Sequence, residues 1–445
     1  MPKKSDGKLG TFDSVNLLVG GMIGSAIFSL SGITIWRAGP ASLVSWILAA
    51  LILFAYGLQT AELASLYPNS GGVFSFPALS LGKTEQQGTL WGWISAWAYL
   101  FGCVAGAAFS AIYVGIYLSV AFPVFAQLQV PIAVLTVLIC GALNAMEFRI
   151  TGKTTTMLTL ILALTLLVFS FVLLGSDTWE IQSFVPFFSQ GKAGRFGFIE
   201  TLPIAMVAYG SIVALSFMVG EIRTPNKTVP KAMAIAMGIV VTLYGLVLFS
   251  TLGLVSSQYL QENEGLRYIP LFASASKVTA GPFLTKLISL SAVLALYTTI
   301  IVTMALAART LQASSDNGLL SPWFGKTHAK TGSPIHAVLA VTLVTGVLGA
   351  IPQLTNFLIN LGALCNVIVI AIISLSVLAS RKKHPLLDKH RFKAPGGTVL
   401  PLLTLLVLFA SYIPSILAGG YLLWVSTLIY YCIGMVLYIR RRSIR

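Results

Sequence analysis

Residues 19–28 read Val19-Gly20-Gly21-Met22-Ile23-Gly24-Ser25-Ala26-Ile27-Phe28 and lie in the middle of an apolar segment, residues 13–36. That segment is long enough to cross a bilayer, which takes roughly 20 apolar residues. A second apolar segment, residues 198–221, has Val207-Ala208-Tyr209-Gly210-Ser211-Ile212 at its centre. We expect glycine to interrupt the helix in the middle of both segments, and this pair of interruptions decides the fold that we predict.

The composition of the chain is that of a membrane protein. Of its 445 residues, 56% are hydrophobic and only 9% are charged, so polar side chains cannot cover a soluble globule. The sequence predicts an all-α integral membrane protein of about 12 transmembrane helices. We place them near residues 13–36, 41–66, 90–120, 131–147, 154–175, 198–221, 230–256, 283–312, 335–351, 355–380, 399–418 and 421–440.

The positive charge follows the predicted topology. The net charge is +15, but most of the 28 Lys and Arg residues fall on one side of the predicted spans instead of gathering in one soluble region. This is the positive-inside pattern, so we expect both termini to be cytoplasmic in a plasma or inner membrane. A nucleic-acid partner is excluded because it needs a basic soluble face.

The two interrupted segments are five spans apart, and an odd repeat length turns the second copy upside down relative to the first. The pattern therefore predicts an inverted five-plus-five repeat, with residues 13–175 as the first copy and 198–380 as the second. Two trailing helices follow in residues 399–440. We treat residues 1–445 as a single transporter domain.

An interrupted membrane helix frees backbone groups that must face a ligand, an ion or water. The helix that resumes at Ser25–Ile27 would offer N–H groups to a carboxylate, and the helix that stops near Val207–Gly210 would offer carbonyls to an ammonium group. Both stretches lack ionised residues. The alternative is that these glycines only allow close helix packing or a kink.

Five stretches of the chain resemble segments of the amino acid–polyamine–organocation (APC) transporters. Gly21–Phe28 is similar to that family's first-span pattern, and residues 220–232, Gly-Glu-Ile-Arg-Thr-Pro-Asn-Lys-Thr-Val-Pro-Lys-Ala, resemble its loop after the sixth span. The further matches are Ala61-Glu62-Leu63 followed by Tyr67–Gly72, Asp316–Leu319 with Pro322, and Phe392–Gly397. The resemblance implies a leucine-transporter-type fold and transport of amino acids.

The resemblance also implies roles for residues at the two interruptions. The amides of Ser25 and Ala26 would bind the substrate carboxylate, carbonyls of the first and sixth spans would receive the ammonium group, and Tyr209 and Ser211 would line the pocket. The full substrate-binding set is Met22, Ile23, Gly24, Ser25, Ala26, Val207, Ala208, Tyr209, Gly210 and Ser211. Further candidates for a substrate contact or gate are Trp97, Tyr99, Cys103 and Ile212.

Residues of the fifth and eighth spans bear on whether transport is coupled to an ion. Proton-coupled members of the family often carry a lysine in the fifth span, and residues 158–163 contain none, which favours exchange or passive transport. Hydroxyls of Thr298, Thr299 and Thr303 offer an alternative site for Na⁺. Glu62, at the end of the second span, is interpreted as a structural partner of a basic loop residue.

The leading hypothesis is a secondary transporter of neutral amino acids that works by alternating access, in the lipid bilayer and without a cofactor. A cationic amino acid or polyamine antiporter and a Na⁺- or H⁺-coupled symporter remain as alternatives, and so does a nutrient receptor. An enzyme is not expected, because no cluster of His, Asp, Glu or Ser–His lies at membrane depth. The four cysteines and four histidines lack metal-site spacing.

Overall fold

The computed structural model describes residues 9–67, 72–146, 152–217, 222–328, 332–383 and 392–442. These residues form helices and turns and contain no β-strand. Within them, eleven helical stretches are long and apolar enough to cross a membrane. The prediction of an all-helical membrane protein is therefore confirmed, although the residues Pro68–Gly71 and Gly220–Glu221 of the family motifs lie outside the described residues.

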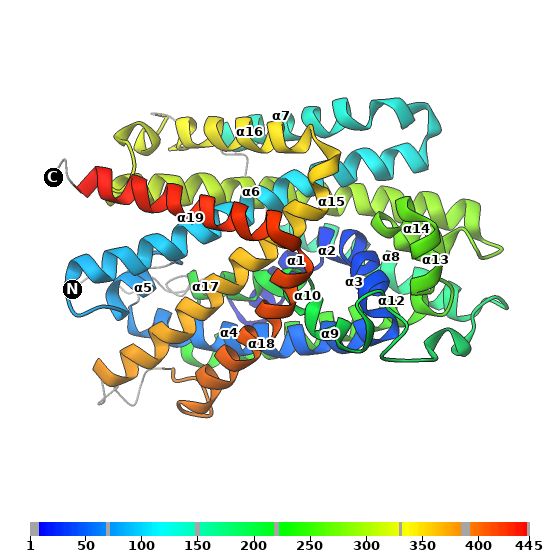
Figure 1. Ribbon diagram of the computed structural model, residues 1–445, viewed down its shortest axis with the longest axis horizontal. Helices are drawn as coiled ribbons and strands as arrows, with labels where there is room; N and C mark the ends of the chain where they lie inside the picture. Colours follow the sequence, from blue (N-terminus) through cyan, green and yellow to red (C-terminus); the bar gives the residue numbers. More distant parts are fainter. Residues whose placement is uncertain are drawn as a thin grey trace.

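Several of the longest helices run along the long axis of the molecule, whereas α17 (Thr355–Lys383) crosses them obliquely, as Figure 1 shows. Eight of the longest helices are long enough to span a membrane without help from a neighbouring helix. These are α4 (Ser42–Leu66), α6 (Glu85–Ala121), α8 (Gly152–Leu174), α12 (Pro225–Leu252), α15 (Gly281–Asp316), α17 (Thr355–Lys383), α18 (Val399–Ala418) and α19 (Gly420–Arg442).

Four predicted spans differ from a single long helix, and one of these, the sixth span, is described with the candidate site below. The fourth is α7 (Gln129–Ala145), with the short helix η2 (Pro123–Leu128) before it. The ninth is α16 (Ile335–Gly349), whose 15 residues make it shorter than the eleven spanning stretches. The first is divided into α1 (Thr11–Met22), α2 (Ser25–Ser29) and α3 (Ser31–Ala38).

One end of the bundle carries the last turns of α19, and the opposite end carries a layer of short helices (Figure 1). That layer is made of α13 (Ser257–Glu262), η7 (Glu264–Tyr268) and α14 (Pro270–Ala275). It packs so closely on α3 that a Cβ atom at Gly32 would lie 2.1 Å from the carbonyl oxygen of Arg267. Glycine is therefore required at position 32 for this layer to pack against α3.

The start of the first segment is tied to the end of the sixth. Leu9 and Ile222 form an isolated parallel β-bridge, and the backbone N–H of Arg223 donates to the carbonyl of Leu9 at 3.0 Å. The first and sixth segments thus lie side by side where Leu9 meets Ile222.

Glu62 of α4 forms a buried ion pair with Arg381 of α17. The guanidinium donates to both carboxylate oxygens, at 2.8 and 2.6 Å, and the two side chains are only 5% and 8% exposed. The carboxylate also accepts the N–H of Ala394 at 2.8 Å, while Arg381 donates to the carbonyls of Ala394 and Gly397. The interpretation of Glu62 as a structural partner of a basic residue is confirmed, and the pair also fixes the segment that leads into α18.

We expect Arg381→Met to destabilise the protein by about 3–5 kcal/mol, because it leaves the Glu62 carboxylate buried without its cation. The double variant Glu62→Leu with Arg381→Met should recover part of this loss, since it removes both charges. Thermal unfolding of the detergent-solubilised protein measures both effects. Glu264→Gln is the matched control, because Glu264 pairs with Arg267 but is 81% exposed, and its loss should cost at most about 1 kcal/mol. Equal losses from Arg381→Met and Glu264→Gln would contradict the prediction.

Candidate functional site

The first segment changes conformation between α1 and α2. Ile23 has φ −73° and ψ 83°, and Gly24 has φ −134° and ψ −149°, so neither residue is helical. The backbone then continues through α2 into α3, since Leu30 donates to the carbonyl of Ala26 at 2.8 Å and Thr34 donates to Leu30 at 3.1 Å. Residues 23 and 24 therefore separate two helical stretches.

The sixth segment is wound differently from the expectation. It consists of α9 (Gly197–Glu200), α10 (Leu202–Met206), the 3₁₀ helix η5 (Val207–Val213) and α11 (Ala214–Phe217). The helix does not stop near Val207–Gly210, as the sequence predicted, but tightens there into a 3₁₀ winding. Hydrogen bonds in a 3₁₀ helix have poorer geometry than those in an α-helix, so the carbonyls of this stretch are less well held.

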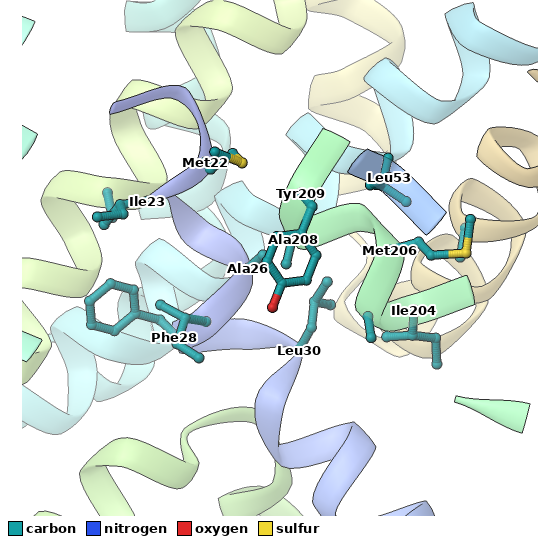
Figure 2. Packing of buried hydrophobic residues seen from close by; sticks show 14 of the residues in the cluster. Met22, Ile23, Ala26, Phe28, Leu30, Leu53, Ile204, Met206, Ala208 and Tyr209 are labelled. Carbon is teal, nitrogen blue, oxygen red and sulfur yellow. The ribbon is translucent and has the colours of Figure 1, made fainter. Parts of the chain in front are cut away.

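The structure brings the two segments together at Gly21 and Ser211. The Ser211 hydroxyl donates to the carbonyl oxygen of Gly21 at 2.8 Å, and a Cβ atom at Gly21 would lie 2.9 Å from the Cβ of Ser211. Gly21 and Gly210 are exposed although most of their neighbours are buried, and a Cβ atom at Gly210 would meet only open space. Figure 2 shows Ala208 and Tyr209 of η5 beside the segment that carries Met22, Ile23 and Ala26.

Tyr244 of α12 holds the end of α1. Its hydroxyl donates to the carbonyl oxygen of Met22 at 2.5 Å. The ring is fully buried and packs against Trp46, with centroids 5.3 Å apart, and against Tyr209, at 5.6 Å. Because both contacts are tilted or edge-to-face, they fix the direction of the hydroxyl.

Thr299 of α15 holds the start of α2. Its hydroxyl oxygen accepts the backbone N–H of Ser25 at 3.2 Å and donates its own hydrogen to the carbonyl of Ala295 at 2.9 Å. Thr298 and Thr303 donate to carbonyls of α15 itself, those of Ala295 and Thr299. Of the three threonines proposed for an ion site, the described contacts bring Thr299 to the interruption.

Helix α6 packs on the other side of α2. The Ser110 hydroxyl lies 3.4 Å from that of Ser25, and the hydroxyls of Tyr113 and Tyr117 each donate at 2.8 Å to the carbonyls of Ser29 and Phe28. One turn from Ser110, a Cβ atom at Gly106 would meet only open space. Polar contacts from α6 therefore hold α2 along its length, and α6 leaves open space at Gly106.

Among the other predicted contact residues, Trp97 and Ile212 pack against neighbouring helices. Trp97 stacks between Trp93 and Tyr430, and its indole N–H donates to the carbonyl of Tyr430 on α19 at 2.9 Å. Ile212 is buried and packs on α4, where its Cγ1 would lie 3.1 Å from a Cβ atom at Gly57. Two further candidates on α6 are the half-buried Tyr99 and the buried Cys103.

Sequence reasoning missed Tyr244, which lies in an uninterrupted span and belongs to none of the motifs. The available signal was a hydroxyl group in the middle of the apolar run Val240–Leu248, at a depth where polar groups need a partner. None of the contacts around residues 21–25 described above involves an ionised side chain. The arrangement can therefore offer amides, carbonyls and hydroxyls to a ligand that brings its own charges.

The sequence model of the amino acid permease family matches residues 9–438. The branched-chain amino acid permease BcaP of Bacillus subtilis is 27% identical over 97% of this chain and 92% of its own length. The methylthioribose transporter of the same organism is 27% identical over 98% of this chain and 94% of its own length. Cationic amino acid transporter 7 of Arabidopsis thaliana is 25% identical over 83% of this chain and 65% of its own length.

The contact between Gly24 and Thr299 yields a testable prediction. A Cβ atom at Gly24 would lie 2.9 Å from the Thr299 hydroxyl oxygen, so Gly24→Ala should destabilise the protein by about 1–3 kcal/mol. The double variant Gly24→Ala with Thr299→Ala should lose less than the sum of the two single losses, because the crowding is gone. Thermal unfolding of the purified protein measures the cycle, and Gly210→Ala, which extends into open space, is the control. Additive losses would contradict the contact.

Proposed function

This chain belongs to the amino acid permease family, and from that premise we propose that it carries neutral amino acids across a membrane by alternating access. The family supports an amino acid as substrate and an integral membrane location. The observation that carries the proposal is the interruption at residues 23–24, where backbone groups of two helical stretches lie beside Gly21, Gly210 and Ser211. A secondary carrier of this kind is not an enzyme.

We propose that the interruption binds the zwitterion of the substrate. The amides of Ser25 and Ala26 would hold the carboxylate, and the carbonyls of Met22, Val207, Ala208 and Gly210 would hold the ammonium group. Dipole ends in a low-dielectric site stabilise charge by up to about 2 kcal/mol, so several of them can replace an ionised partner. Tyr209 and Ser211 would line the remaining wall, with Ile23 and Gly24 providing the bend.

The side chain of the substrate would occupy the open space beside Gly210. A cationic side chain would need a carboxylate there and an acidic one a guanidinium, and the contacts described above include neither. This supports a neutral substrate, in line with the branched-chain permease among the relatives, over the cationic substrate that the name of the Arabidopsis relative carries.

We further propose that the fold is the inverted repeat of residues 13–175 and 198–380. The first and sixth segments lie next to each other, as the two equivalent helices of an inverted repeat do. An even number of spans puts both termini on one side, and the excess of Lys and Arg in the predicted loops of that side supports cytoplasmic termini.

The carrier would work by exchange or by downhill transport. The fifth span, α8, has no lysine in residues 158–163, the stretch where the resemblance leads us to expect one in a proton-coupled member of the family. A Na⁺-coupled mode is the alternative, since the hydroxyl of Thr299 lies at the interruption.

Uptake into proteoliposomes tests the proposal. Vesicles are preloaded with different unlabelled amino acids, and uptake of labelled neutral, cationic and acidic amino acids is measured with and without Na⁺ and proton gradients. We expect uptake of neutral amino acids that needs neither gradient. Uptake confined to cationic substrates, or strictly dependent on Na⁺, would establish one of the alternatives, and no uptake of any amino acid would overturn the proposal.

Gly210→Leu should abolish uptake of neutral amino acids without lowering the melting temperature. The new side chain would fill the open space at Gly210, which the structure leaves free of neighbours within 4 Å. Gly238→Leu is the matched control, because Gly238 on α12 is also exposed and free of neighbours but lies outside the proposed site. Normal transport by Gly210→Leu would count against this location of the site.

A further inference from the structure

The interruption in the first segment is capped by hydroxyl groups of other segments. The hydroxyls of Tyr244 and Ser211 donate to the carbonyls of Met22 and Gly21, respectively. The Thr299 hydroxyl accepts the amide N–H of Ser25. We propose that Tyr244 and Thr299 are internal caps that satisfy the interruption between transport events and so allow the carrier to reorient without substrate. This inference rests on the proposed function.

The first step of the argument is the free energy of the backbone groups. A peptide amide or carbonyl without a partner in a low-dielectric interior is strongly destabilising. Reorientation of a carrier moves its central helices through a closed conformation from which water is excluded. A carrier whose interruption lacked partners would therefore cross that conformation only with substrate bound, and it would be restricted to exchange.

The second step is the match between the hydroxyls and a zwitterion. The Thr299 oxygen accepts a hydrogen bond from an amide, as a carboxylate oxygen would, and the hydroxyls of Tyr244 and Ser211 donate to carbonyls, as an ammonium group would. The caps thus present the same donor and acceptor pattern as the proposed substrate. Substrate and caps compete for the same backbone groups, and either one can satisfy them.

The third step is the positioning of the caps. Tyr244 is held between Trp46 and Tyr209, and its hydroxyl points at Met22 without a flexible stem. The Thr299 hydroxyl gives its single hydrogen to Ala295, which leaves its lone pairs directed at Ser25. Because both groups are fixed by their own helices, little entropy is lost when they bond to the interruption.

The experiment compares net uptake into unloaded proteoliposomes with exchange in vesicles preloaded with the same neutral amino acid. Wild-type protein should show both activities. In Tyr244→Phe and Thr299→Val, net uptake should fall by about tenfold, which corresponds to about 1.4 kcal/mol in the barrier. Exchange should change by less than about threefold, because bound substrate supplies the missing hydrogen bonds.

Three variants serve as controls. Thr299→Ser keeps the hydroxyl and should retain the wild-type ratio of net uptake to exchange. Thr285→Val removes a hydroxyl of α15 that bonds only to carbonyls of its own helix turn, and Tyr297→Phe removes a hydroxyl of α15 that lies 3.1 Å from Thr136 on α7. Neither of these should change the ratio.

The outcomes separate this inference from the proposed function. A wild-type protein that exchanges amino acids but takes up none into unloaded vesicles would overturn the inference and leave amino acid transport standing. Parallel losses of net uptake and exchange in Tyr244→Phe and Thr299→Val would also overturn it, because the hydroxyls would then be needed with substrate bound. Unchanged ratios would do the same. Absence of both activities in the wild type would instead refute the proposed function.

Discussion

The constraint on which the rest of the structure depends is that backbone groups exposed by a change of winding in a buried helix must find partners. At residues 23–24 the first segment leaves its helical conformation. Hydroxyl groups of neighbouring segments form hydrogen bonds with the backbone of Met22, Ser25 and Gly21. These contacts tie α12, α15 and η5 to the interruption.

Hydroxyls suit this task better than ionised side chains would. A lone buried carboxylate or ammonium group needs a counter-charge to be stable, and a fixed counter-charge would compete with a zwitterionic ligand. A neutral hydroxyl satisfies one backbone group, and in the proposed carrier a charged group of the substrate would take its place. The described ion pair of Glu62 and Arg381 has a different role, because it joins two segments permanently.

Aromatic residues have two roles: some orient a hydroxyl group at the interruption, and others attach one helix to another. Trp46, Tyr209 and Tyr244 form a buried group that orients a hydroxyl at the interruption. Trp97 and Tyr430 stack with centroids 4.9 Å apart and exchange hydrogen bonds through each other's carbonyls, which attaches α19 to α6. The tryptophans of α6 would give the same sequence pattern whether they contact a ligand or pack against a helix. Only the position of the partner helix distinguishes these two roles.

The sequence by itself determined the helical membrane class, the positions of most spans and the glycine stretches at the centre, because hydropathy and glycine act locally. It also identified Glu62 as a structural residue. The 3₁₀ winding at Val207–Val213, the role of Tyr244 and the packing of Trp97 were decided only by the tertiary structure. Tyr244 and Trp97 depend on partners more than a hundred residues away in the sequence. The 3₁₀ winding depends on a balance between two helical conformations that differ little in energy. Neither dependence leaves a pattern in the local sequence.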